Sequence, residues 1–195
     1  MKTVLRLQAT ATALLLASAC SILPESEPVQ LLDPQLQSPP PASGHIDWTL
    51  NVARPESDPA RDSARVLVRT GQGQLQVHAT ARWVAAAPEL LRTRLVRYLR
   101  DSQGIAQVSA GAAGLDRTLV LDLRAFELVE TQGGRLEAEI RLEARLYERR
   151  SAELLARELF ETRRPVDGAG PAEIVEGFEA ALAQIIPALA DWLKD

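Results

Sequence analysis

The sequence predicts an α+β fold, in which a mixed, mainly antiparallel sheet carries two helices packed on one face. Three observations support this prediction. Runs of alternating apolar and polar residues fill most of the chain after residue 45, two stretches have helical periodicity, and glycine-rich turns separate the longest runs. The 195-residue chain is therefore expected to form a single domain after a leader and a proline-rich linker.

The strand predictions rest on period-two alternation, which places every second side chain on the same face of a sheet. Glycines at 71–73 and at 132–134 predict turns, and the second of these joins the two longest strands as a hairpin. The expected strands are 48–52, 66–68, 75–84, 105–109, 118–130 and 135–149.

In the segment 135–149 the periodicity and the composition disagree. Its Glu, Ala, Leu and Arg residues favour a helix by propensity. On a helix the apolar residues would be scattered around the circumference, whereas on a strand they form one face opposite Glu137, Glu139 and Glu143. We therefore predict a strand, with these acids solvated on its exposed face. The next segment, 154–163, is compatible with a strand or with a helix that starts at Ser151.

Two helices are expected, and a proline begins each of them. The first starts at Pro88, carries one apolar stripe and ends at Gly104. The second starts at Pro171 and runs to Trp192. Pro187 lies inside this second stretch, where the missing amide hydrogen predicts a kink or a break.

Residues 1–19 have the features of a secretory signal peptide. Lys2 and Arg6 precede a mostly apolar run, and small residues follow it. The run is shorter than the ~20 residues needed to span a bilayer as a helix. Cys20 is the only cysteine of the chain and follows these small residues directly, so it is the predicted lipid attachment site. The alternative is an ordinary secreted protein, cleaved after residue 19.

Residues 20–44 are rich in proline and are predicted to be an extended linker that holds the domain, residues 45–195, away from the membrane. In a polyproline II conformation the linker would reach roughly 70 Å. A short strand at 29–32 is an open alternative within it.

Charge and composition exclude several functions. Removing Lys2 and Arg6 with the signal lowers the net charge from −4 to −6, which disfavours nucleic acid as a partner. His45 and His78 have no second ligand at metal spacing, and no nucleophile motif is present, so no catalytic, cofactor or metal site is expected. Trp48 and Trp83 are candidate partner contacts, with packing in the core as the alternative.

Several motifs together resemble the ABC-type transport auxiliary lipoproteins, the PqiC-like family. The resemblance covers nearly the whole mature chain, and its strongest part is the Ala-Arg-Trp end of a strand followed by Pro-x-Leu-Leu. The motifs lie at 19–21 with Pro24, 48–52 with Pro55, 62–66, 73–83, 88–91 and 191–193.

The resemblance implies a non-catalytic component of an MCE/ABC-type intermembrane lipid transport system. Its implied partners are the membrane, through the lipid anchor, and a periplasm-spanning MCE-domain protein (PqiB-like) with its permease, and a homo-oligomer is a further implied assembly. Ser21 after the cysteine implies the outer membrane, at its periplasmic face. The alternative function is an envelope lipoprotein that regulates a cell-wall synthase or stabilises another outer-membrane complex.

Overall fold

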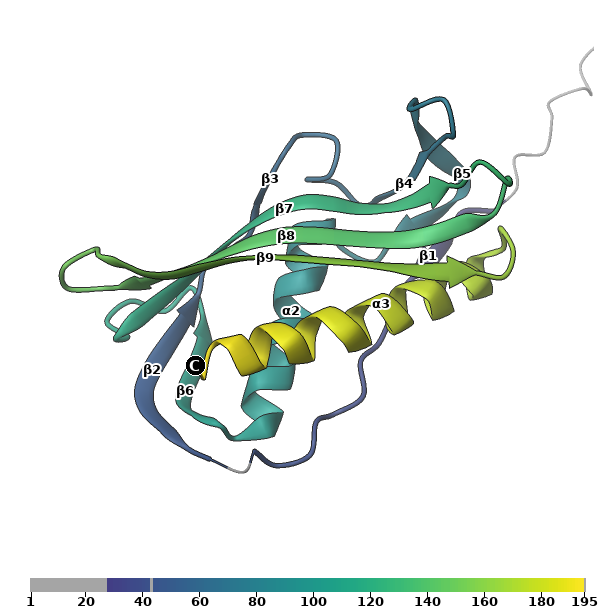
Figure 1. Ribbon diagram of the computed structural model, residues 1–195. Helices are drawn as coiled ribbons and strands as arrows, with labels where there is room; N and C mark the ends of the chain where they lie inside the picture. Colours follow the sequence, from purple (N-terminus) through teal and green to yellow (C-terminus); the bar gives the residue numbers. More distant parts are fainter. Residues whose placement is uncertain (1–27, 43, 195) are drawn as a thin grey trace, which may run out of the picture.

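The computed structural model describes residues 28–42 and 44–194. Within this part of the chain, nine strands form one open mixed sheet, and two helices cover one of its faces (Figure 1). The predicted α+β fold is confirmed. The strands are β1 (Gln30–Leu32), β2 (Ile46–Val52), β3 (Glu56–Ser57), β4 (Arg65–Arg69), β5 (Leu75–Trp83), β6 (Ile105–Ala110), β7 (Arg117–Glu130), β8 (Leu136–Glu148) and β9 (Leu154–Val166), and the helices are α2 (Ala87–Ser102) and α3 (Pro171–Trp192).

Strand β7 organises the sheet. One of its edges pairs antiparallel with β8 along its whole length, and β8 pairs antiparallel with β9. Its other edge pairs in succession with β2, β3 and β4, all of them parallel to it. Strand β5 continues the sheet from β4, and β1 pairs parallel with β5. The long ladders are thus antiparallel and the parallel ladders are short, and β1 and β9 lie at opposite edges.

The core lies between the sheet and the two helices. Trp83, Phe126 and Phe178 meet at its centre, with ring centroids 4.7 to 5.4 Å apart. Helix α3 approaches the sheet closely at Gly177, where a Cβ atom would lie 2.5 Å from Cγ2 of Val166. A glycine at this position therefore lets the helix pack directly on β9.

Helix α3 continues through Pro187, so the predicted break is absent. A residue with an amide hydrogen at 187 would bond the carbonyl of Ala183. Ala183 is solvent-exposed, and water can replace the missing donor there. The open alternatives at 29–32 and 154–163 are both resolved as strands, β1 and β9. Strand β3 was not predicted, because two residues are too few to show a period.

The structure differs from the expected linker, because residues 28–42 lie against the domain. Leu32 is buried on β1, and residues 33–42, which we call the strap, cross both helices. Arg94 Nε on α2 donates a hydrogen bond to the carbonyl of Pro34 at 2.8 Å. The Gln35 amide donates to Glu179 Oε1 on α3 at 2.8 Å, and the Ala42 amide donates to the Ser102 carbonyl at 2.8 Å.

These contacts explain why the strap packs on the domain despite its prolines. A proline-rich segment carries few amide donors of its own, but its carbonyls are free to accept from Arg94, a largely buried cation that needs such partners. Gly104 also makes room for the strap, since a Cβ atom there would lie 3.0 Å from Cβ of Ala42. Of the predicted linker, residues 20–27 and residue 43 lie outside the described residues.

Candidate functional site

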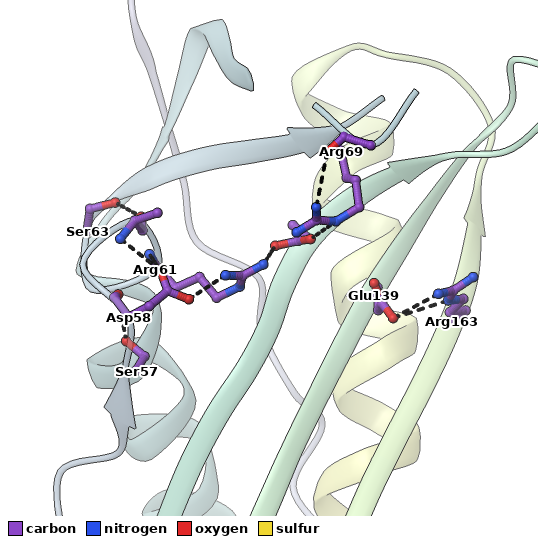
Figure 2. Close-up of polar contacts among 10 residues, drawn as sticks. Ser57, Asp58, Arg61, Ser63, Arg69, Glu139 and Arg163 are labelled. Atoms are coloured by element: carbon purple, nitrogen blue, oxygen red, sulfur yellow. Dashed lines mark hydrogen bonds and ion pairs between the residues drawn. The ribbon is translucent and has the colours of Figure 1, made fainter. Parts of the chain in front are cut away.

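The sheet face turned away from the helices, here called the outer face, carries an arginine–glutamate network. Glu127 on β7 accepts from two arginines, Arg61 in the loop after β3 and Arg69 on β4, with 2.7 Å between Arg69 Nε and Glu127 Oε1. Figure 2 shows Arg61 and Arg69 reaching toward each other from opposite sides. Only 1 % of Glu127 is exposed. Its charge is therefore balanced inside the protein rather than by water.

The network continues across β8 to the edge strand. Arg163 Nη2 on β9 lies 3.0 Å from Glu139 Oε1 (Figure 2). Glu143 accepts from Arg124 on β7 and, at 2.9 Å, from Arg157 on β9. The predicted solvation of Glu139 and Glu143 is therefore wrong, because both are buried.

The charges of this network determine how Glu143 titrates. Burial by itself would raise the pKa of Glu143, but hydrogen bonds and positive charge from Arg157 and Arg124 outweigh it and hold the pKa below its ordinary value. A carboxylate in this state is an ionised structural group. Its lowered pKa is the opposite of the raised pKa that a general acid needs.

Trp48 on β2 is half-buried, and it packs in part against the hydrophobic core. The Arg117 guanidinium lies 4.2 Å from the centroid of its ring, which is a cation–π distance. Next to it, the amide and hydroxyl of Thr49 both donate to Asp116 Oδ2 at 2.9 Å, and these bonds lower the pKa of Asp116. Trp48 is thus held in place and half-exposed, and a partner contact there stays a prediction.

Trp83 belongs to the core instead, with 1 % of its surface exposed. It packs against Phe126 and Phe178, so its ring is not exposed for a partner to contact. The structure supports the alternative, core packing. The sequence placed Trp83 at the end of a strand but gave no sign of which helix covers it.

The two histidines contact different parts of the fold. His78 Nε2 lies 3.2 Å from the carbonyl of Ala169, and His45 Nδ1 lies 3.3 Å from the carbonyl of Gln103. Across 28–42 and 44–194, no three His, Cys, Asp or Glu side chains gather in a way that would hold a metal ion. Neither described helix is long and apolar enough to cross a membrane. Cys20 lies outside the described residues.

Comparison with known proteins identifies the family of the chain. The family model described as "ABC-type transport auxiliary lipoprotein component" matches residues 30–190. A crystal structure of a Xanthomonas campestris protein of the DUF330 family is similar, with a TM-score of 0.80 and 30 % identity over 85 % of this chain and 94 % of that one.

A second crystal structure, of an uncharacterised protein, has a TM-score of 0.65 and 18 % identity, over 85 % of this chain and 99 % of the other, and shows the same fold. Comparison with the curated proteins gives no match. The match at 30–190 begins with β1 and includes the strap, in agreement with their packing on the domain. This chain belongs to the family of ABC-type transport auxiliary lipoprotein components.

Proposed function

We propose that this protein is a non-catalytic outer-membrane lipoprotein, anchored through Cys20, that docks a periplasm-spanning MCE-domain protein of an intermembrane lipid transport system. The family match over residues 30–190 carries this proposal. The signal peptide and the cysteine that follows it supply the anchor, and Ser21 favours the outer membrane.

The geometry of the domain agrees with a docking role. On its outer face the buried carboxylates are already paired with arginines, so this face offers charge and shape to a partner. Trp48 is the proposed contact with the partner, because a half-exposed tryptophan that is held by its neighbours gives a large contact area at a low cost in entropy.

The test is a crosslinked pull-down of the full-length, membrane-anchored protein from its own host, with partners identified by mass spectrometry. We expect an MCE-domain protein, and we expect W48A to reduce its recovery. The variant W192A, which changes a tryptophan on α3, is the matched control. Recovery of cell-wall synthases alone would overturn the proposal and favour the alternative function, a lipoprotein that regulates a cell-wall synthase.

A further inference from the structure

Five aliphatic side chains lie exposed along one edge of the sheet, and we call them the apolar edge. They belong to β1, to β5 and to the residues next to these strands, and between 38 % and 69 % of each is exposed. The apolar edge consists of Val29, Leu31, Leu75, Val77 and Val84.

Strand register places these side chains on the same face. Val77 pairs with Leu67, and Leu67 pairs with Glu127 of the outer face. Leu32 and its partner Trp83 point into the core. Successive side chains of a strand point to opposite faces, so Leu31 points to the outer face. Val84, directly after Trp83, likewise points outward. The apolar edge is thus a strip of the outer face along β1 and β5, with Arg82 lying within it opposite Leu31.

The charge around the strip is unusual for this chain. A quarter of all residues are charged, but residues 70–81 contain no acid and no Lys or Arg. Two arginines accompany the strip: Arg82 on β5 lies between Val77 and Val84, and Arg65 at the start of β4 pairs with it in the sheet. Arg65 is exposed and Arg82 is half-buried. The strip therefore combines aliphatic side chains with two positive charges.

The covalent distance to the anchor is short, because the strap and β1 belong to the domain. Seven residues lie between Cys20 and Pro28, and the eight residue-to-residue steps span at most about 29 Å in any conformation. The apolar edge begins at the next residue, Val29. In Figure 1 the described chain starts at the end of the molecule that carries the β4–β5 and β7–β8 turns.

We infer that the apolar edge rests on the phospholipid surface of the membrane that holds the anchor. Its aliphatic side chains would enter the boundary between headgroups and acyl chains, and Arg65 and Arg82 would contact the lipid phosphates. An anchor within this reach keeps the bilayer at high effective concentration, so a weak contact is sufficient. This inference rests on lipid attachment at Cys20, which is part of the proposed function.

The opposite edge of the sheet provides a matched control. Leu159 on β9 lies on the same outer face, and 50 % of it is exposed, a fraction within the range of the apolar edge. It has the same chemistry, but β9 is at the other edge from β1. Position 159 is therefore expected to stay in water.

The test uses full-length acylated protein in vesicles of phosphatidylethanolamine and phosphatidylglycerol that contain doxyl-labelled lipid. Single cysteines are introduced as L31C, V77C and L159C and labelled with an environment-sensitive fluorophore, since acylated Cys20 has no free thiol. We expect at least twofold stronger quenching at positions 31 and 77 than at 159. Mass spectrometry of the N-terminal peptide establishes acylation in the same samples.

Equal quenching at the three positions, or none at any, in acylated protein overturns the inference and leaves the proposed function standing. Absence of acylation overturns the anchor itself, and with it both proposals. A third outcome is that fluorophores at 31 and 77 are shielded from water in native envelope vesicles but are not quenched in pure lipid vesicles. This outcome overturns the lipid contact and means that a protein, either a second copy or another partner, covers the strip. The substitutions R65Q and R82Q should reduce quenching at 77 in vesicles rich in phosphatidylglycerol.

Discussion

Glu127 is the buried acid on which two arginines of the outer face depend. Arg61, itself 10 % exposed in its side chain, loses its compensating charge if Glu127 is neutralised. Removing one partner of a buried ion pair costs more than the pair contributes, because the remaining charge stays desolvated. Substitutions at the exposed ends of the network should therefore change stability little, whereas substitutions at its buried centre should reduce it strongly.

We expect E127Q to lower the free energy of unfolding by about 3 kcal/mol. Urea unfolding followed by circular dichroism measures this change. The control is D62N, which alters the exposed pair of Asp62 with Arg54 and should leave the unfolding midpoint almost unchanged. Equal effects of both variants would mean that burial of Glu127 contributes nothing.

At the scale of elements, the contact of α3 with the sheet depends on a residue without a side chain. We expect G177A to destabilise the protein, because overlap with Val166 costs about 1–3 kcal/mol, whereas alanine improves helix propensity by only about 1 kcal/mol. Denaturant unfolding of G177A, V166A and the double variant forms a cycle. The double variant should recover part of the loss, and strict additivity would contradict the proposed overlap.

The stability of the protein should depend on pH through Glu143, which lies on the central strand β8. Its pKa is lowered in the folded state, so its contribution is present above the unfolded pKa of about 4.3 and is lost as the pH falls through the folded value. We expect the melting temperature of the wild type to exceed that of E143Q at pH 7, and the difference to shrink below pH ~4. In R157Q, which removes one partner, this dependence should be weaker.

Most elements could be predicted from the sequence, since alternation determines which strand residues share a face. In β8 this period correctly outweighed helical composition, and β9 was one of two stated alternatives. Burial of the acids could not be predicted, because it depends on arginines of neighbouring strands, such as Arg163. The apolar edge was missed for a related reason. Leu75 and Val77 alternate like core residues, but a register shift between β4 and β5 turns them to the outer face.

At the scale of the whole molecule, β1 and the strap lie between the proposed anchor, Cys20, and the helices along the chain. We expect a chain that begins at residue 45 to be less stable than one that begins at Pro28. Loss of buried Leu32 removes about 2 kcal/mol, and loss of the acceptors of Arg94 about 2 kcal/mol more. Thermal unfolding of the two chains measures the difference, and equal melting temperatures would show that the strap is dispensable.

The pairing of β7 has a consequence for how the protein folds. Strands β2, β3 and β4 all lie before β7 in the chain, yet each of them bonds to it. Residues 46–69 therefore have no β7 edge to pair with until residues 117–130 are in place. Folding must close these long loops first, which is characteristic of slow, high-contact-order domains. During that interval the early strands are open to aggregation, and a chaperone that binds extended segments would protect them at that stage.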